Sequence, residues 1–539
     1  MKMKNKIFLI ISVIATIVGF SSCENFLDET PNKSGSAYIY HMDQLYGLTG
    51  SVNLYLGNGL SADNAINNGE SAFYMSEPYL MSDAIEITPD YYSHNGVGGI
   101  DPIRNYKIYS WDNSIRDNEI LDLTWRAAYE RIYRFNTVLE NLDRVIQTTE
   151  VIRNQVEGEA RFGRAYFHFM LLTQYCQWGE ETPGIGYREG TNPDEIPERE
   201  TVGYTMKRIY EDLQLAEECL QKAGRTQFNF STNTRPTLPT VQAFRARVDL
   251  YRGNYESALE NANAALEAHS ELVNLNADVN HMMMEIPNSL MLMDKDGNMT
   301  FKSTTMLPML MNTPGRPFLE YKELFLPNAS STMMCGSWIP ISESFSNLWD
   351  KNFDLRWQKF YNIHYYYLMM SPIMGYGMIP WSNGQYLREL DFHTFCRFYT
   401  YGAYAGQIVG MTTAEMYLIK AECMVRTGAS ESNVAEVLKT LRRTRFSNQA
   451  VADNIGGTVK DVLDERFREM GAFWRFFDIK RLNGAENANI EIRRKVLADP
   501  TNPNAIIDLV IPANDPRWAM PIYQTQCELM GWQQNVGWE

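Results

Sequence analysis

The stretch 124-TWRAAYERIYRFNTVLENLDRVIQTTEVIRNQVEGEARFGRAYFHFMLLTQYCQWGEETP-183 decides the fold of this chain. In its first half, apolar residues recur at steps of three and four, the spacing of one helical face: Trp125, Tyr129, Ile132, Phe135, Leu139, Leu142 and Ile146. Its second half places a mixed small and large set on one face: Ala160, Gly163, Phe167, Met170 and Leu171. We predict two consecutive amphipathic helices, whose small residues let a neighbouring backbone approach closely. Both helices need partners to bury their apolar stripes.

Further helices of the same kind follow. Residues 201–223 predict one helix, and residues 240–268 predict a helical hairpin that turns at Arg252-Gly253-Asn254. The small, aromatic and turn residues of that hairpin match one tetratricopeptide repeat. A comparable pattern returns at 412–445, with a turn at Gly428. Self-similar helix pairs in both halves of the chain favour a solenoid, in which each repeat buries the stripe of the next.

Residues 271–407 differ from the helical stretches on both sides. Helical periodicity fades there, proline and glycine become frequent, and methionine is concentrated between Met282 and Met311. The run 290-LMLMDKDGNMTF-301 predicts a β-hairpin that turns at Asp296-Gly297. A calcium-binding EF-hand loop is the disfavoured alternative, because Thr305 stands where the bidentate glutamate belongs. The methionines are better explained by packing than by copper binding.

We therefore predict a mainly α fold, a tetratricopeptide-like helical-repeat scaffold with a large irregular, loop-rich portion that contains short β-hairpins. The repeats occupy mainly 41–270 and 408–485 of a single domain, 41–539, and the irregular insertion spans about 271–407. A first helix is expected within 41–60, and an aromatic, loop-rich section within 61–118. An aromatic helix includes 473–481, and 486–539 forms a C-terminal packing segment whose last forty residues pack irregularly.

The N-terminus has the features of an export signal. Lysines at positions 2, 4 and 6 precede an apolar run from Ile7 to Phe20, and Ser21-Ser22 precede Cys23. The run is shorter than the about 20 residues that span a bilayer. A small-small-Cys ending resembles the lipobox of bacterial lipoproteins; the alternative is a plain secretory signal. We expect residues 1–22 to be removed, Cys23 to be lipidated, and 23–40 to be a tether between the lipid anchor and the globular body.

Charge and cysteine usage exclude several classes of function. Removing the three signal lysines leaves 46 basic against 65 acidic residues, a net charge of −19. This balance argues against nucleic acid, whose phosphates require a basic surface, and favours a neutral or cationic ligand. The six cysteines after Cys23 include no CxxC pair and no zinc-like spacing, and the sequence leaves their disulfide state open.

The sequence contains no motif of a known catalytic site. There is no GxSxG, no GxxxxGK[ST], no GxGxxG after a strand and no HExxH. The seven histidines are dispersed, and His168, in an aromatic helix, is better explained as a core residue than as a ligand. Pairs of carboxylates are inevitable among 65 acids and carry no weight. We expect no catalytic activity, no cofactor and no metal.

Aromatic residues in loops remain as candidates for binding. A sugar ring has an apolar face that stacks on Trp or Tyr, while its hydroxyls require polar partners. Two regions combine these types, 90–95 and 338–386. The candidate ligand-binding residues are Tyr91, Tyr92, Asn95, Trp338, Trp381, Asn383 and Tyr386. The alternative is that these aromatic residues pack the irregular half, and Trp111 and Trp357 fit that alternative better than Trp338 or Trp381.

Short motifs follow one another along nearly the whole chain: Phe26-Leu27-Asp28 after Cys23; Trp125-x3-Tyr129-x2-Ile132-x3-Asn136-x2-Leu139; Glu159-Ala160-Arg161-Phe162-Gly163-Arg164-Ala165; Tyr175, Gly179 and Pro183; Gly253-Asn254-Tyr255; Ala414-Glu415-Met416-Tyr417-Leu418-Ile419-Lys420-Ala421-Glu422; Glu465-Arg466; Phe477-Asp478-Ile479-Lys480-Arg481; and Gln534-Asn535. Each motif is weak alone, but their order and spacing resemble the SusD/RagB-like outer-membrane lipoproteins of Bacteroidetes. Two positions depart from the family pattern. Gly163 stands where leucine is usual, and Tyr523 where a second proline is common; both concern packing.

The resemblance implies four tetratricopeptide-like helix pairs and a less regular remainder that carries the ligand. It also implies a SusC-like TonB-dependent transporter as partner, to which a captured nutrient, usually a glycan, is delivered. It further implies lipid anchoring in the outer membrane, facing the extracellular side. Binding residues vary in this family, so no fixed site can be transferred. A peptide-binding import protein and a lipid-anchored glycoside hydrolase are the alternative functions.

Overall fold

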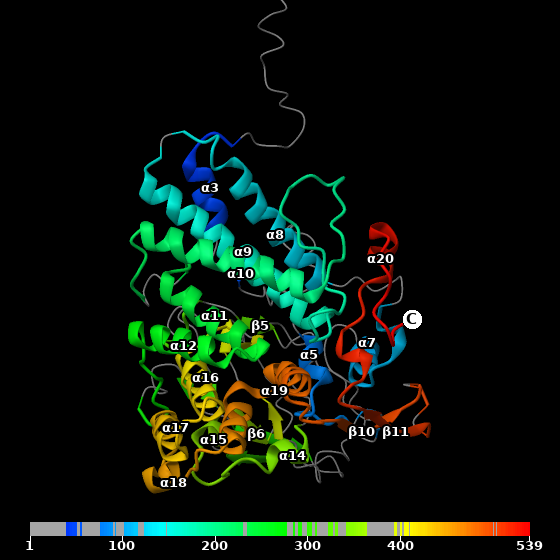
Figure 1. The fold of residues 1–539 in the computed structure, drawn as a ribbon. Helices are drawn as coiled ribbons and strands as arrows, with labels where there is room; N and C mark the ends of the chain where they lie inside the picture. Colours follow the sequence, from blue (N-terminus) through cyan, green and yellow to red (C-terminus); the bar gives the residue numbers. More distant parts are fainter. Residues whose placement is uncertain are drawn as a thin grey trace, which may run out of the picture.

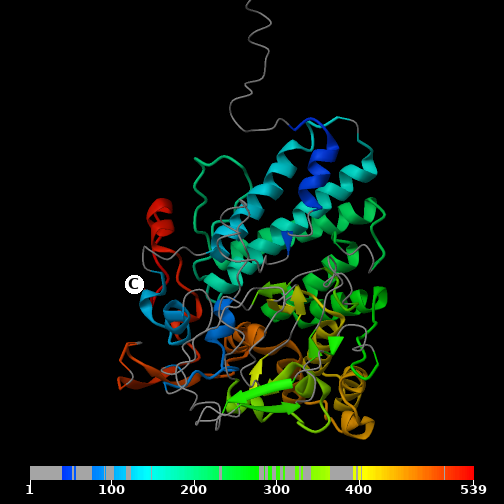
Figure 2. The same cartoon turned by 180° about the vertical axis from the view of Figure 1, so that it is seen from behind.

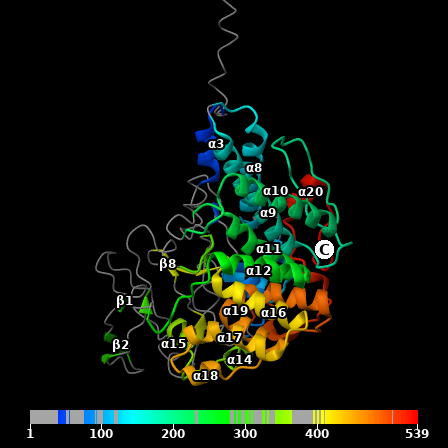
Figure 3. The same cartoon turned by 60° about the vertical axis from the view of Figure 1, so that its left-hand side comes forward.

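The computed structural model describes residues 39–50, 54–55, 76–89, 92, 102–116, 123–146, 148–229, 234–277, 284–285, 289–293, 299–303, 308–309, 322–326, 329–331, 341–363, 393–395, 399–401, 404–408, 410–499, 501–502 and 504–539. The fold is mainly helical, as predicted, and its strands are short (Figure 1). Successive helices form a stack that extends from α3 and α8 at one end to α17 and α18 at the other (Figures 1 and 3).

The two helices predicted in 124–183 are present as α8 (Leu123–Asn141) and α9 (Glu150–Tyr175), and they pack against each other. The hydroxyl of Thr149 caps α9 by accepting a hydrogen bond from the Ile152 N–H. The α8 stripe is buried as its periodicity requires, except at its end. Ile146 is 57% exposed because α8 stops at Asn141, so its assignment to the buried stripe was wrong.

Gly163 of α9 makes room for an aromatic ring of α8. A Cβ atom at this position would lie 2.2 Å from Cζ of Phe135, much closer than any van der Waals contact. The Phe135 ring is fully buried and stacks on Phe167 at 6.2 Å. The glycine therefore admits a side chain, not a neighbouring backbone as the sequence suggested. A larger side chain such as leucine would displace Phe135.

The following helices continue the stack in chain order. These are α10 (Val202–Lys222), α11 (Leu238–Arg252), α12 (Tyr255–Ala268), α16 (Thr413–Arg426) and α17 (Glu431–Arg445). The predicted turns at Gly253 and Gly428 are confirmed, and both glycines have positive φ angles, +81° and +90°. Helix α12 packs directly on α16, so the stack remains continuous across the irregular insertion that separates them in sequence (Figure 3).

The section 61–118 is more helical where it is described than the sequence suggested. It contributes α5 (Ser76–Met81), α7 (Pro102–Tyr109) and the 3-10 helix η2 (Asn113–Arg116). Its aromatic residues serve the core, because Tyr79, Tyr106, Tyr109 and Trp111 are buried. The first described helix, α3 (Met42–Thr49), is shorter than the predicted span 41–60.

The irregular portion carries short antiparallel strands, visible in Figure 2. The strands are β1 (Met284–Glu285), β2 (Ser289–Met293), β3 (Met299–Ser303), β4 (Pro308–Met309), β5 (Ala329–Ser331), β6 (Tyr361–Ile363), β7 (His393–Phe395), β8 (Tyr399–Tyr401) and β9 (Tyr404–Ile408). The predicted hairpin is confirmed, because β2 pairs with β3 and Met293 faces Met299. Two short helices, α14 (Glu343–Ser346) and α15 (Leu355–Phe360), connect this portion to the helical stack.

The C-terminal region is more regular than predicted. After α18 (Gln449–Asp453) and α19 (Val459–Glu486), it forms the hairpin β10 (Ile492–Leu497) and β11 (Ile506–Ile511), the 3-10 helix η7 (Pro516–Trp518) and α20 (Gln524–Met530). The prediction of irregular packing was therefore wrong for β11 and α20. Trp518 and Trp538 pack on Trp111, with ring centroids 5.1 Å and 6.5 Å from it, which confirms the structural role of Trp111.

The guanidinium of Arg356 is buried inside a group of carboxylates. It contacts Asp354, Glu465 and Glu469, each at 2.7 Å, and so ties α15 of the irregular portion to α19. Burial alone would raise the pKa of Glu465, but the positive charges of Arg356, Arg468 and Arg442 hold that pKa well below its ordinary value. Glu465 therefore stays ionised in the folded protein.

Further buried ion pairs extend this arrangement along the stack. Arg445 of α17 joins Glu469 at 2.9 Å and Glu323 at 2.8 Å. Arg247 of α11 binds Glu415 of α16 through two hydrogen bonds, at 2.8 and 2.5 Å. Glu415 of α16 and Glu465 of α19, which belong to the short motifs of the sequence, are thus partners of buried arginines.

Replacing Gly163 tests the packing of α8 on α9. Gly163→Ala should lower the free energy of unfolding by about 1–3 kcal/mol, because its methyl group collides with the Phe135 ring. Gly47→Ala is the control, since a Cβ there meets nothing within 4 Å; it should be neutral or raise stability by up to about 1 kcal/mol. Equal effects of the two changes in urea denaturation would refute this account of Gly163.

Replacing Arg356 tests the buried charges. Arg356→Met should lower the free energy of unfolding at pH 7 by about 3–5 kcal/mol, because it removes the buried cation that Asp354, Glu465 and Glu469 share. In the wild type, a depressed pKa for Glu465 means that the unfolded chain binds more protons below about pH 4.5, so stability falls on acidification. The variant should lose less stability between pH 7 and pH 4 than the wild type.

The control for this experiment is Arg493→Met, which removes an exposed ion pair with Glu491. Such a pair contributes about 0–1 kcal/mol. An Arg356 variant that matched this control in stability, or kept the wild-type pH dependence, would contradict the assigned role of Arg356.

Candidate functional site

Most of the predicted ligand-binding residues lie outside the part of the chain that the structure describes. They are Tyr91, Asn95, Trp338, Trp381, Asn383 and Tyr386, and the predicted lipidation site Cys23 lies outside it too.

Tyr92 is the one predicted ligand residue among the described ones. It is half-buried, and its ring centroid lies 3.9 Å from that of Tyr106. Tyr106 is itself buried, and its hydroxyl accepts a hydrogen bond from the Leu497 N–H at 2.6 Å. Burial raises the pKa of Tyr106 to about 12. The ring of Tyr92 therefore packs against the core on the ring of Tyr106. A role for Tyr92 in binding stays a prediction.

Trp349 and Trp357 occupy the described part of the second aromatic region. Both are buried, with ring centroids 5.8 Å apart. The structural interpretation of Trp357 is thereby confirmed.

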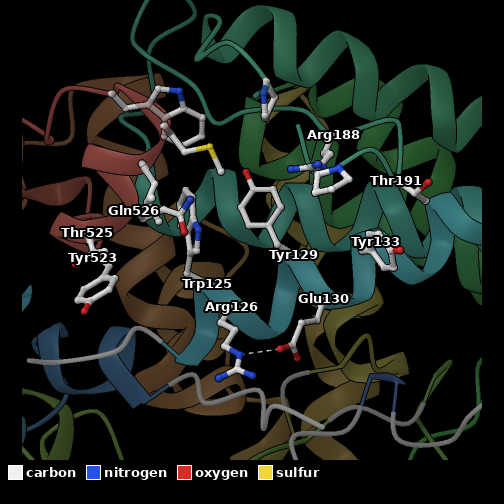
Figure 4. Close-up of a pocket in the computed structure, with 15 residues that line it drawn as sticks. Trp125, Arg126, Tyr129, Glu130, Tyr133, Arg188, Thr191, Tyr523, Thr525 and Gln526 are labelled. Carbon is white, nitrogen blue, oxygen red and sulfur yellow. Dashed lines mark hydrogen bonds and ion pairs between the residues drawn. The ribbon is translucent and has the colours of Figure 1, made fainter. Parts of the chain in front are cut away.

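A pocket of about 510 Å³ opens between α8, the loop 188–197 and α20 (Figure 4). We call it the α8–α20 pocket. Its lining is dominated by aromatic, aliphatic and proline side chains: Trp125, Arg126, Tyr129, Glu130, Tyr133, Arg188, Thr191, Pro193, Pro197, Tyr523, Thr525, Gln526, Leu529, Met530 and Trp532. The sequence alone does not reveal this pocket, because its walls come from three distant segments. Two of these segments, the 188–197 loop and α20, are too short or too irregular to show helical periodicity.

The floor of the pocket is an aromatic cluster. Trp125 is only 4% exposed, and its ring meets Tyr175 edge-on at 4.9 Å and Trp532 at 6.1 Å. The neighbouring Tyr129 donates its hydroxyl hydrogen bond to the Gly186 carbonyl at 2.9 Å. Burial raises the pKa of Tyr129, so this hydroxyl remains a neutral donor. The prediction that Trp125 serves helix packing is confirmed, although one surface of the ring also lines the pocket.

His168 holds the loop that forms one wall. Its Nε2 accepts a hydrogen bond from the Arg188 N–H at 3.0 Å, so Nδ1 carries the proton and donates to the Arg164 carbonyl at 2.9 Å. The ring also stacks on Tyr187 at 3.9 Å. Burial lowers the pKa of His168 to about 3, which keeps the ring neutral. The prediction of a core histidine is confirmed.

Two further side chains fix the same loop. Asn136 of α8 donates hydrogen bonds to the carbonyls of Arg188 and Gly190, at 3.0 and 3.2 Å. Asp212 of α10 accepts a hydrogen bond from the Tyr187 hydroxyl and binds Arg164 at 2.7 Å. The loop is therefore positioned by α8, α9 and α10 together, and the pocket wall is preorganised.

Some polar groups of the pocket lining are paired within the protein. Arg126 contacts Glu130 at 2.7 Å (Figure 4), and Thr191 binds Glu140 through its N–H and its hydroxyl. Among the described residues of the lining, Glu130 is the single carboxylate, and none is a histidine or a cysteine. This composition suits binding of an apolar group and provides no pair of nucleophile and base.

Reactive thiols are not part of this site. Cys176, Cys219, Cys423 and Cys527 are buried and free, and burial raises the pKa of Cys176 and of Cys219 to about 11. Cys335 and Cys396 lie outside the described residues. Within the described residues, no three His, Cys, Asp or Glu side chains converge as metal ligands would. None of the described helices is both long and apolar enough to span a bilayer.

His168→Gln tests how the pocket wall is held. With a folded-state pKa near 3, His168 makes the unfolded chain bind more protons below about pH 6.5, so stability falls as the pH drops. The wild type should lose about 1 kcal/mol more than the variant between pH 7 and pH 5.5. Urea denaturation at both pH values measures this difference. Parallel losses in the two proteins would show that His168 is not buried in its neutral form.

Two family models match the chain. One, described as starch-binding associating with outer membrane, matches residues 81–250, and the other, described as the SusD family, matches residues 398–538. A comparison with curated proteins found no match.

Several solved structures share the fold. A SusD superfamily protein from Bacteroides thetaiotaomicron has a TM-score of 0.59 and 16% identity, covering 92% of this chain and 99% of its own. A surface glycan-binding protein A from Bacteroides uniformis has a TM-score of 0.58 and 16% identity, with coverage of 92% and 100%. A putative sugar binding protein from Bacteroides vulgatus has a TM-score of 0.57 and 17% identity, with coverage of 94% and 100%.

Proposed function

Because the chain belongs to the SusD/RagB family, we propose that it binds an oligosaccharide or polysaccharide nutrient and delivers it to a SusC-like TonB-dependent transporter without altering it. The family matches at both ends of the helical stack carry this proposal. Similar structures described as sugar-binding or glycan-binding support the choice of ligand.

The proposal places the protein at the outer membrane, held by lipid on Cys23 and facing the extracellular side. The signal that ends at Ser21-Ser22-Cys23 supports lipid anchoring. The acidic residues directly after it, Glu24, Asp28 and Glu29, resemble the signal that sends such lipoproteins to the cell surface.

Recognition is proposed to reside in the irregular portion and in the 90–95 loop, with Tyr91, Tyr92, Asn95, Trp338, Trp381, Asn383 and Tyr386 as binding residues. The use of tryptophan in the described residues supports this location. Most of those indoles are buried in the core: Trp111, Trp125, Trp349, Trp357, Trp474, Trp518 and Trp538. Trp178 donates to the Tyr251 carbonyl and is covered by Arg252 at 4.6 Å. Trp532 is the one other described indole, and it lines the α8–α20 pocket. We propose Trp338 and Trp381 as the platforms for sugar stacking.

The two alternative functions predict different results for labelled ligands. Incubation of the mature protein with labelled polysaccharides should deplete the bound glycan without producing new reducing ends. Release of reducing ends would establish a glycoside hydrolase. Calorimetry against matched panels of oligosaccharides and peptides separates the other two functions. Binding confined to the peptide panel, and weakened by Trp338→Ala or Trp381→Ala, would replace the glycan proposal by peptide import.

Single tryptophan variants test the proposed platforms. Trp338→Ala or Trp381→Ala should weaken glycan binding by about 1–3 kcal/mol, because each removes a stacking surface. The thermal unfolding transition should be unchanged. Loss of that transition would instead show that the residue belongs to the core.

Trp532→Ala is the matched control, since Trp532 lines the separate α8–α20 pocket. It should leave glycan affinity unchanged. A weaker glycan affinity in this variant, with full affinity in both platform variants, would move the sugar site to the helical half.

A further inference from the structure

The mouth of the α8–α20 pocket exposes large apolar side chains to water. Tyr133 of α8 is 52% exposed, and Leu529 of α20 is 68% exposed. Ile196, between the lining prolines Pro193 and Pro197, is exposed as well. Apolar groups gathered around a concave, aromatic floor are typical of surfaces that bind another molecule.

The chemistry of the pocket fits an apolar side chain better than a sugar. A sugar needs polar partners for hydroxyls around its whole rim, but the Tyr129 hydroxyl is engaged with Gly186. The Arg126 Nε and the Thr191 hydroxyl are likewise engaged, with Glu130 and Glu140. Sugar hydroxyls that faced the apolar floor of Trp125 and Trp532 would lack partners, which is unfavourable. An aliphatic or aromatic side chain has no such requirement.

The rim selects by charge. Between Arg188 and Glu200 the sequence carries five acidic residues and two arginines. Arg188 binds the Asn192 carbonyl and Arg199 binds the Gly184 and Gln533 carbonyls; both keep their charge, so five acids against two arginines leave the segment at −3. The acids at 194, 195, 198 and 200 are exposed, and α20 adds the exposed Glu528. The lining itself contributes Arg126, Arg188 and Glu130. The 188–200 segment beside the pocket is therefore negative and attracts cationic groups.

The pocket is also rigid enough to bind without a large ordering penalty. The His168 and Asn136 hydrogen bonds hold the wall loop at its start, and two prolines restrict its remainder. Preorganisation of this kind favours binding, because little conformational entropy is lost on association.

We propose that the α8–α20 pocket docks a cationic polypeptide segment of a partner protein. One aliphatic or aromatic anchor residue enters the pocket above Trp125 and Trp532, and flanking lysine or arginine residues face the acidic 188–200 loop. The pocket volume of about 510 Å³ accommodates such an anchor and part of a neighbouring residue. This inference goes beyond the proposed function, because the docking site and the proposed glycan residues lie on different segments.

A phage-displayed library of random dodecapeptides, selected on the immobilised mature protein, tests the proposal. Selected peptides should carry an aromatic or aliphatic residue flanked by lysine or arginine. Measured by fluorescence anisotropy, Tyr133→Ala and Leu529→Asp should each weaken binding of a selected peptide about tenfold, because they remove the apolar rim. Both side chains are exposed, so the fold should survive these changes, and thermal unfolding verifies it.

The control variant is Ile507→Asp on β11, an equally drastic change at an exposed aliphatic residue outside the pocket. It should leave peptide affinity unchanged. Asp194→Lys combined with Glu198→Lys should weaken binding of the selected peptide. The same double variant should bind more tightly a version of the peptide in which glutamate replaces the lysines and arginines.

Three results would overturn the proposal. The first is that every selected peptide binds the Tyr133 and Leu529 variants as tightly as the wild type, and the second is that the selection enriches acidic peptides. The third is that those variants lose oligosaccharide binding, which would assign the pocket to sugar. Failure of the glycan proposal is recognised separately. In that case the wild type would bind no oligosaccharide but would still bind the selected peptide.

Discussion

The buried contact of Arg356 with Asp354, Glu465 and Glu469 is the interaction on which the rest of the structure depends. A guanidinium in this position must be matched by carboxylates in a fixed geometry, because an unpaired charge in the interior is strongly unfavourable. It therefore fixes the position of α15 relative to α19. Glu465 and Glu469 also bind Arg442 and Arg445 of α17, which links that helix to the same group. The irregular half is anchored to the helical half through charges, in addition to apolar packing.

The residues that support the fold and the residues proposed for recognition belong to different segments. The stack of helices uses its aromatic residues for its own core, as the Trp111–Trp518 and Phe135–Phe167 contacts illustrate. Loops attached to such a stack can vary in sequence without loss of the fold, because the buried charges and rings lie elsewhere. The α8–α20 pocket belongs to the support, and its chemistry differs accordingly from that of a sugar site.

The sequence predicted the elements whose signals are local. Helices α8 and α9 follow from apolar periodicity, the α11–α12 turn from Gly253, and the β2–β3 hairpin from Asp296-Gly297. It did not predict α5, α7 or α20, because short helices among prolines and glycines have little periodicity and are stabilised by tertiary contacts. The partners of buried charges were equally inaccessible: Arg356 lies more than 100 positions from Glu465. The α8–α20 pocket forms only when the 188–197 loop, α8 and α20 come together in the fold, so no single segment of the sequence predicts it.

Hydrogen–deuterium exchange of the mature protein, with and without a bound oligosaccharide, tests most directly whether a rigid helical body carries recognition in its irregular portion. The account predicts that the sugar slows exchange within 271–407 and around residues 90–95. It predicts no change in α8, α9 or α20. Protection concentrated in α8, the 188–197 loop and α20, with none in 271–407, would contradict it.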